Sequence, residues 1–185
     1  MAEGAGRDRG LNTISFRLDP PLDGAAFRRL VEVWVDVSNA GGAVGFAPPP
    51  PSVTFDDVVP LADSALRMVR EGRDHIVVAY DGATIVGFAF LEHRPGPLFR
   101  HWATVKRLQV HPGEQGRGIG RELLRACERL GRSVGLEALH LTVRGGTGTE
   151  AFYETEGYEV VATIPDAIRV SPDDTRPELY MVKRL

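Results

Sequence analysis

A glycine-rich loop, Gln115-Gly116-Arg117-Gly118-Ile119-Gly120, lies between a predicted strand and a predicted helix. Backbone N–H groups at a helix N-terminus are unpaired and lie at the positive end of the helix dipole, so they bind anions. The alternate glycines remove side chains that would hold a phosphate away, and Arg117 and Arg121 add positive charge. The loop therefore predicts a phosphate-binding site, because a tight turn alone would need one glycine and no arginines.

Two other kinds of phosphate loop fit this stretch less well. A dinucleotide-binding loop has the pattern Gly-x-Gly-x-x-Gly, but the sixth position counted from Gly116 is Arg121. In addition, the strand that should end in an acidic residue ends at Arg144. A nucleoside-triphosphate loop ends in Gly-Lys-Ser or Gly-Lys-Thr, and neither occurs in the sequence.

The elements around the loop predict a mixed α/β fold. Strand 104–110, helix 121–134 and strand 139–143 form a strand, loop, helix, strand unit, which implies a parallel pair with a right-handed crossover. Asp81-Gly82-Ala83 predicts a hairpin between two more strands. We expect a mostly antiparallel sheet with helices on both faces. The other predicted elements are strands 13–18, 75–80, 84–91, 158–164 and 179–184, and helices 23–39 and 58–69.

The remaining local signals concern the domain and its ends. A chain of 185 residues with 43% hydrophobic composition suits one core, so we expect a single domain over residues 13–185. Residues 1–12 are small, polar and charged, which predicts a flexible tail. Thr147-x-x-Glu150 is typical of a capping box and predicts a short helix that ends before Gly157.

Composition excludes several classes of protein. A net charge of −3 without a basic stripe disfavours a nucleic-acid partner. The longest apolar runs fall short of the roughly 20 residues of a membrane span, and the first residues contain no signal core, so we expect a cytoplasmic protein without a membrane partner. Cys127, the single cysteine, is expected to be a buried thiol. The five histidines lack metal-ligand spacing, which predicts no metal.

Two motifs together resemble the GCN5-related N-acetyltransferase (GNAT) family. Its signature, Gln/Arg-x-x-Gly-x-Gly/Ala after a Val-x-Pro strand end, is matched at every fixed position by residues 115–120, which follow Val110-His111-Pro112. Its second motif appears as Phe152-Tyr153 and Gly157-Tyr158. The resemblance covers residues 13–185 and implies the GNAT fold, in which the two central parallel strands splay apart.

The resemblance also implies a cosubstrate and roles for site residues. Acetyl-CoA is the expected cosubstrate, and Tyr153 is expected to protonate the departing thiolate. Gly146 stands where the family commonly has an asparagine that contacts the coenzyme. Backbone groups of a bulged strand end are expected at the pantetheine arm and acetyl carbonyl, and the loop at the pyrophosphate: Leu108, Gln109, Val110, and Gln115, Gly116, Arg117, Gly118, Ile119, Gly120, Arg121.

The acceptor side is less clearly marked. Residues 41–46 look like a segment of the branch that includes tabtoxin resistance acetyltransferases, which makes Gly45 and Phe46 the expected substrate-binding residues. Glu92 ends the strand before the acetyl-binding one and is the candidate general base. His93, His101 and His111 lie near strand ends but are more typical of surface positions. Acidic residues that either receive a cationic amine or solvate a loop are Asp166, Asp173, Asp174 and Glu178.

The sequence thus predicts an N-acetyltransferase that moves the acetyl group of acetyl-CoA to a primary amine of a small molecule. Direct attack in a ternary complex is expected, because Cys127 lies inside a helix and is unsuited to form an acyl-enzyme. Three alternatives stay open: a catalytically silent acyl-CoA-binding regulator, an acetyltransferase of protein or peptide amines, and a nucleotide-binding module. A homodimer is also left open.

Overall fold

The computed structural model of the protein describes residues 13–46 and 52–185. The predicted tail of residues 1–12 lies outside them. The strands are β1 Ile14–Leu18, β2 His75–Asp81, β3 Thr84–His93, β4 Trp102–Val110, β5 Ala138–Arg144, β6 Glu159–Ser171 and β7 Asp174–Arg184. The helices are α1 Gly24–Asn39, α2 Phe55–Arg70, α3 Ile119–Ser133 and α4 Thr149–Thr155, with short 3₁₀ turns η2 Pro97–Phe99 and η3 Pro112–Glu114.

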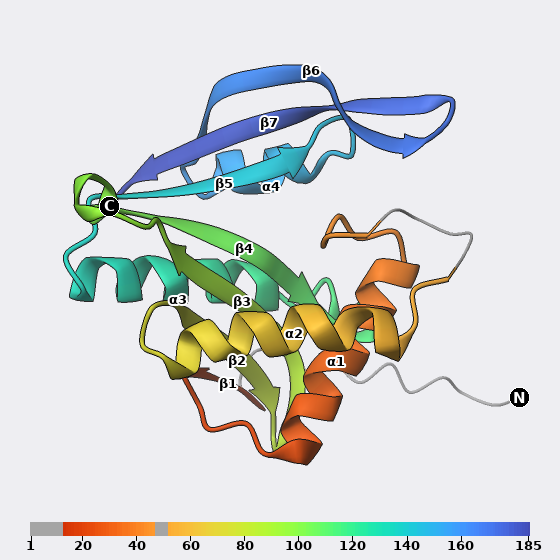
Figure 1. Cartoon of the computed structure of the whole chain (residues 1–185), viewed down its shortest axis with the longest axis vertical. Coiled ribbons are helices and arrows are strands. Elements are labelled where there is room, and N and C mark those ends of the chain that lie inside the picture. The colour runs from red at the N-terminus through yellow and green to blue at the C-terminus, as the bar shows by residue number, and fades with distance from the viewer. Residues whose placement is uncertain (1–12, 47–51) are drawn as a thin grey trace, which may run out of the picture.

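The strands form one sheet in the order β1-β2-β3-β4-β5-β7-β6 (Figure 1). Each neighbouring pair is antiparallel except β4 and β5, which are parallel and are joined through α3. This confirms the predicted mixed, mostly antiparallel sheet with one central parallel pair. None of the helices in the described part of the chain is long and apolar enough to cross a membrane.

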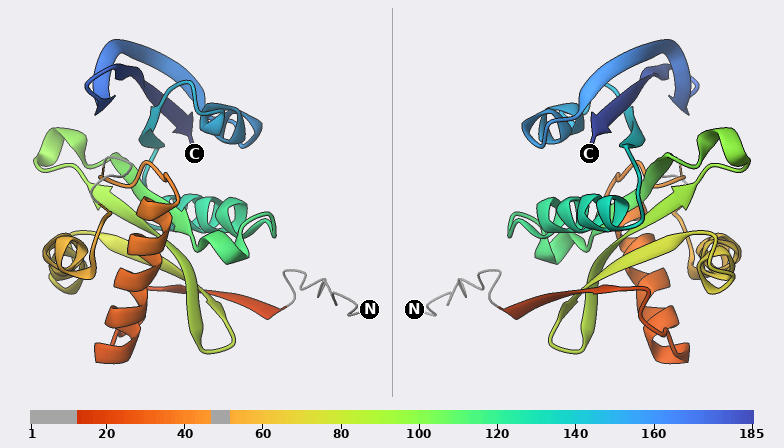
Figure 2. Two further views of the ribbon diagram at one scale, coloured as in Figure 1. Left: turned by 90° about the vertical axis from the view of Figure 1, so that its right-hand side faces the viewer. Right: turned by 90° about the vertical axis from the view of Figure 1, so that its left-hand side faces the viewer.

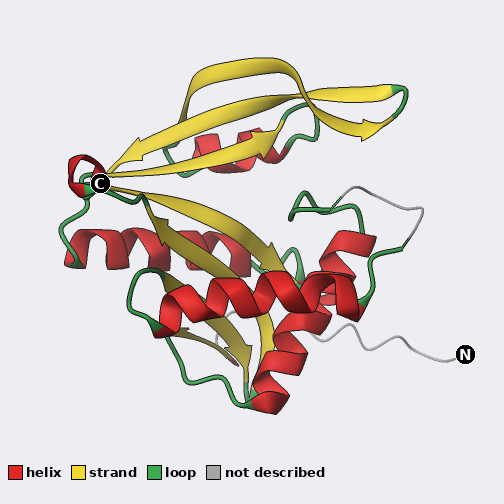
Figure 3. Ribbon diagram, viewed as in Figure 1, coloured by secondary structure: helices red, strands yellow, loops and turns green. Residues whose placement is uncertain are grey.

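Helices cover both faces of the sheet, as predicted (Figures 2 and 3). On one face, α1 and α2 pack on a core that contains Trp34 and Phe88. On the other face, α3 packs on a second core that contains Leu123 and Leu124. Neighbouring residues of β2 alternate between the two cores, because successive side chains of a strand point to opposite faces.

The two central strands separate soon after they pair. Only residues Trp102–Thr104 of β4 pair with Ala138–His140 of β5, and beyond them the two ribbons diverge (Figure 1). On its other side β4 has a bulge, because Phe88 pairs with Gln109 but Phe90 pairs with Lys106. Arg107, inside the bulge, has a left-handed φ of 51°. The splay and the bulge expected from the family resemblance are both present.

Two local predictions are wrong near the C-terminal end. The capping box at Thr147 does not form: α4 begins at Thr149 after Gly148, which has a left-handed φ of 78°. The Thr147 hydroxyl instead donates to the Arg144 carbonyl at 3.0 Å. Strands β6 and β7 also extend well beyond their predicted ends and form a long hairpin.

Candidate active site

A cavity of about 630 Å³ lies where β4 and β5 diverge. Its walls come from the end of α1 and the segment after it, the ends of β4 and β5, the glycine-rich loop with the start of α3, and α4. The lining residues are Val37, Gly42, Ala43, Val44, Leu108, Gln109, Val110, Glu114, Gln115, Gly116, Gly118, Ile119, Gly120, Arg121, Thr142, Val143, Arg144, Thr147, Thr149, Phe152 and Tyr153. Most of the residues predicted for the site therefore meet in one place.

The glycine-rich loop leads directly into α3. Gly116 and Gly118 have φ values of 78° and 79°, in the left-handed region where a side chain is strained. Gly118 is the N-cap of α3, and no side chain in the described part of the chain caps this end of the helix. The first N–H groups of α3 are therefore available to an anion in the cavity.

The loop is also tied to the end of β4. The Gln115 side-chain amide donates to the Val110 carbonyl at 3.1 Å. Leu108 and Val110 both face the start of α3, since a Cβ on Gly120 would lie 3.7 Å from Leu108 Cδ2 and 3.8 Å from Val110 Cγ2. The bulged strand end and the loop thus form adjoining parts of one wall.

Arg117 and Arg121 have the same expected role in the sequence, but the structure places them differently relative to the cavity. Arg121 lines the cavity, whereas Arg117 is not among the lining residues. The Arg117 guanidinium forms ion pairs with Glu114 and, at 3.1 Å, with Asp81 at the end of β2. Of these two arginines, Arg121 is therefore the one placed to add positive charge to the cavity wall.

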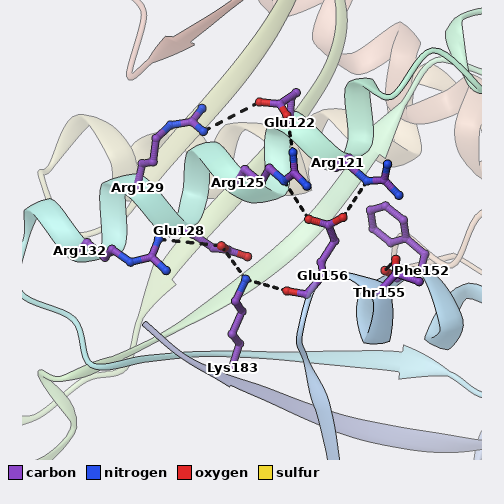
Figure 4. Close-up of polar contacts among 10 residues, drawn as sticks. All are labelled: Arg121, Glu122, Arg125, Glu128, Arg129, Arg132, Phe152, Thr155, Glu156 and Lys183. Carbon is purple, nitrogen blue, oxygen red and sulfur yellow. Dashed lines mark hydrogen bonds and ion pairs between the residues drawn. The ribbon is translucent and has the colours of Figure 1, made fainter.

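Glu156 joins the start of α3 to the end of α4 (Figure 4). Its buried carboxylate lies 2.7 Å from Arg121 Nε and 3.0 Å from Arg125 Nε. Behind it, Lys183 Nζ donates to the Glu156 carbonyl at 2.6 Å. Sequence analysis missed this contact; the signal was the i, i+4 spacing of Arg121 and Arg125, which places them on one helix face.

Tyr153 brings a titratable hydroxyl to the cavity from α4. Its ring packs against Phe152 and Tyr158, with centroids 5.0 Å and 5.9 Å away. Burial, with a smaller effect of Cys127, raises the pKa of Tyr153 to about 12, so the hydroxyl keeps its proton at neutral pH. No hydrogen bond joins this hydroxyl to another described residue, so it can donate to a ligand.

Cys127 is fully buried in α3, as predicted. Burial raises the pKa of its thiol to about 12. The thiol is therefore neutral at physiological pH and is a poor nucleophile.

The residues predicted to bind the acceptor do not line the cavity, although their neighbours in the chain do. Gly42, Ala43 and Val44 line the cavity, whereas Gly45 and Phe46 are not among the lining residues. This segment is anchored at both ends of its cavity-facing part: Trp34 Nε1 donates to the Val44 carbonyl at 2.9 Å, and Arg144 donates to the Gly41 carbonyl at 2.8 Å. The four acidic residues named as candidate amine receptors also lie outside the lining set.

Glu92, the candidate general base, lies on β3 away from the cavity lining. Its carboxylate pairs with Lys106 at 3.2 Å and with Arg107 at 3.0 Å. The structure therefore does not bring Glu92 together with Tyr153. None of the three histidines near the strand ends is among the described residues that line the cavity.

Residues 72–160 match the family model of the acetyltransferase (GNAT) domain. Nearly half of the chain is therefore similar to the GNAT acetyltransferase domain. A mycothiol acetyltransferase from Thermomonospora curvata is 36% identical over 77 residues, which are 42% of this chain and 25% of that protein. The chain thus spans about a quarter of the length of this curated relative.

Solved structures share the GNAT fold over nearly the whole chain. The protein yncA from Salmonella typhimurium, solved with its cofactor acetyl-CoA, has a TM-score of 0.72 at 19% identity, and the match covers 94% of this chain and 95% of that one. A ribosomal-protein-alanine N-acetyltransferase from Brucella melitensis has a TM-score of 0.71 at 21% identity and covers 93% and 99%. The predicted fold class is confirmed.

Proposed function

We propose that this GNAT domain transfers the acetyl group of acetyl-CoA to the primary amine of a small molecule, by direct attack in a ternary complex. The proposal rests mainly on one observation: a single cavity holds the glycine-rich loop, the bulged end of β4 and the Tyr153 side chain. The acetyl-CoA bound to the Salmonella relative, which shares the fold, supports this donor.

In the proposed complex, the loop and the start of α3 hold the pyrophosphate. Free backbone N–H groups supply most of the binding, and Arg121 adds charge from the cavity wall. Backbone groups of Leu108, Gln109 and Val110 contact the pantetheine arm and the acetyl carbonyl. The residues assigned to the pyrophosphate are Gln115, Gly116, Gly118, Ile119, Gly120 and Arg121, with Arg117 acting through its ion pairs on the loop.

The reaction forms a C–N bond and breaks the C–S bond of the thioester. The neutral amine attacks the carbonyl carbon, and the Val110 amide stabilises the oxyanion of the tetrahedral intermediate. As the intermediate collapses, its positively charged nitrogen loses a proton to water in the cavity, and the thiolate leaves and takes the proton of the Tyr153 hydroxyl. The tyrosinate is then reprotonated by solvent, because its pKa of about 12 lies far above physiological pH.

The acceptor amine must also lose a proton, since an unperturbed ammonium titrates near pH 10.4. We assign this proton to water in the cavity rather than to Glu92, whose carboxylate is held by Lys106 and Arg107 outside the lining. The acceptor itself lies against the 42–44 segment, with Gly45 and Phe46 supporting that segment from outside.

Two measurements test the proposal against its alternatives. In calorimetry with acetyl-CoA, ATP and NAD, we expect only acetyl-CoA to bind, which a nucleotide-binding module would contradict. In a thiol-release assay with a panel of amines and peptides, we expect turnover with a small amine. Binding without turnover on any acceptor would indicate the silent regulator, and turnover on peptides alone would indicate a protein acetyltransferase.

A further inference from the structure

Among the described residues, the lining at the acceptor end of the cavity contains one cation and no carboxylate. Three charged side chains line the cavity within the described residues: Glu114, Arg121 and Arg144. Glu114 and Arg121 belong to the loop side, and both are in ion pairs, with Arg117 and Glu156 respectively. Arg144 alone belongs to the opposite side, beside the 42–44 segment.

The Arg144 side chain is held in place, but most of its N–H donors have no partner among the described residues. It is the last residue of β5, and one Nη2 hydrogen donates to the Gly41 carbonyl at 2.8 Å. This is the only polar contact of its side chain within the described chain, and no carboxylate there forms an ion pair with it. A guanidinium has five N–H donors in a planar fork, so Arg144 retains enough donors to bind a carboxylate with two hydrogen bonds.

The strand geometry shows which face Arg144 occupies. Leu141 and Val143 pack in the core beneath α3, so Thr142 and Arg144 lie on the opposite face of β5. This is the face toward α1 and the 42–44 segment, where the acceptor is proposed to bind. The pyrophosphate site lies on the α3 side, so Arg144 is separated from the proposed coenzyme phosphates.

A second observation comes from Gln109, which lines the same cavity from β4. Its side chain is 3% exposed, and neither polar atom of its amide has a partner among the described residues. A buried amide without partners is unfavourable, and a polar ligand or water next to it relieves this. Among the described residues that line the acceptor end, there is thus one cation and one unsatisfied neutral amide, but no carboxylate.

We propose that the acceptor amine also carries a carboxylate, as an amino acid does, and that Arg144 binds this carboxylate. This inference rests on the proposed acetyltransferase function. It makes polyamines and other polycationic amines poor acceptors, because Arg144 repels them and no carboxylate lines the acceptor end within the described part of the chain. Binding of the carboxylate also orients the α-amine toward the thioester, so the interaction contributes to selectivity as well as to affinity.

The test compares each amino acid with its carboxamide, which keeps the amine and side chain but lacks the negative charge. Thiol release should give a kcat/KM about 10-fold to 100-fold higher for the acid. Arg144→Gln should remove this preference by raising KM for the acid, with little effect on the carboxamide. Arg144→Lys should retain part of it, because the charge remains but the bidentate geometry is lost.

Controls separate recognition from a structural role of Arg144. Arg169→Gln changes an exposed arginine of β6 outside the cavity lining and should leave all parameters unchanged. The affinity for acetyl-CoA should be the same in every variant. If Arg144→Gln lowers turnover of acid and carboxamide equally, Arg144 acts only by holding Gly41, and the inference is wrong.

The result for the parent protein separates the two proposals. If it binds acetyl-CoA and acetylates only amines without an anionic group, the acceptor inference is wrong but the proposed function stands. If acetyl-CoA does not bind, or no amine in the panel releases thiol, both are wrong.

Discussion

Replacing Tyr153 by Phe removes only the hydroxyl that is proposed to protonate the leaving thiolate. The ring contacts with Phe152 and Tyr158 can be kept, and the hydroxyl has no hydrogen bond to other described residues, so the fold should be unaffected. General acid catalysis contributes roughly 100-fold to 10,000-fold. A thiol with a pKa near 8.5 is already a fair leaving group, so we expect the low end, about 100-fold at pH 7 or ~2.7 kcal/mol.

The loss should shrink as the pH rises. Burial raises the pKa of Tyr153 to about 12, so the parent keeps its acid across the whole range, whereas the variant depends on the thiolate leaving without a proton. The variant should therefore approach the parent at about pH 9.5, above the thiol pKa. The assay is a pH profile of kcat by thiol release, with pre-steady-state kinetics to show that chemistry limits the parent and calorimetry to show unchanged acetyl-CoA affinity. Near-full turnover of the variant at pH 7 under these conditions would refute the assignment.

Three further predictions concern the loop and its supports. Gly118→Ala and Gly135→Ala each place a side chain at a left-handed φ, 79° and 80°, and each should lower the free energy of unfolding by about 1–2 kcal/mol. Only Gly118→Ala should weaken acetyl-CoA binding in calorimetry. Equal affinities in the two folded variants would contradict the loop's role. Arg121→Ala should weaken the binding of acetyl-CoA more than that of acetyl-pantetheine, which lacks the pyrophosphate. The effect should be larger for Arg121→Ala than for Arg117→Ala, because Arg117 is not among the lining residues. A larger effect of Arg117→Ala would contradict the assignment of Arg121 to the cavity wall. Glu156→Gln should lower the free energy of unfolding by about 1–2 kcal/mol in urea denaturation, because two charge-assisted contacts to half-exposed arginines are lost. The control Glu154→Gln changes an exposed side chain and should have no effect. An unchanged midpoint for Glu156→Gln would show that the contacts contribute nothing.

Local signals were sufficient for the central part of the fold. The hairpin at Asp81-Gly82-Ala83 and the strand, loop, helix, strand unit depend on turn chemistry and periodicity within short windows, and the structure confirms both. The β6–β7 hairpin was predicted too short because Pro165 and Pro177 normally interrupt strands. Here Pro165 lies in an irregular stretch of the edge strand, where the register shifts between Ile164 and Ile168. An edge position is a tertiary property that a short window does not contain.

In the candidate site, too, local motifs were predictive, whereas contacts with residues distant in the chain were not. The glycine-rich loop and Tyr153 were identified from motifs, and the structure places them on one cavity. The sequence gives no means of separating Arg117 from Arg121, because the difference depends on Asp81, 36 residues from Arg117 in the chain. Arg144 entered the sequence analysis only as a strand end, since its neighbour Gly41 is 103 residues away.

The position of Tyr153 depends on α3 more than on its own helix. Helix α4 has seven residues and no side-chain cap, and an isolated helix of this length is unstable in water. Its C-terminal end is fixed by the Tyr158 N–H, which donates to the Tyr153 carbonyl at 3.0 Å, and by the Glu156 carboxylate, which binds Arg121 and Arg125 on α3 (Figure 4). Arg121 also lines the proposed pyrophosphate site. The same ion pairs therefore set the distance between the coenzyme loop and the proposed acid, which is the distance that the coenzyme must span between its pyrophosphate and its sulfur.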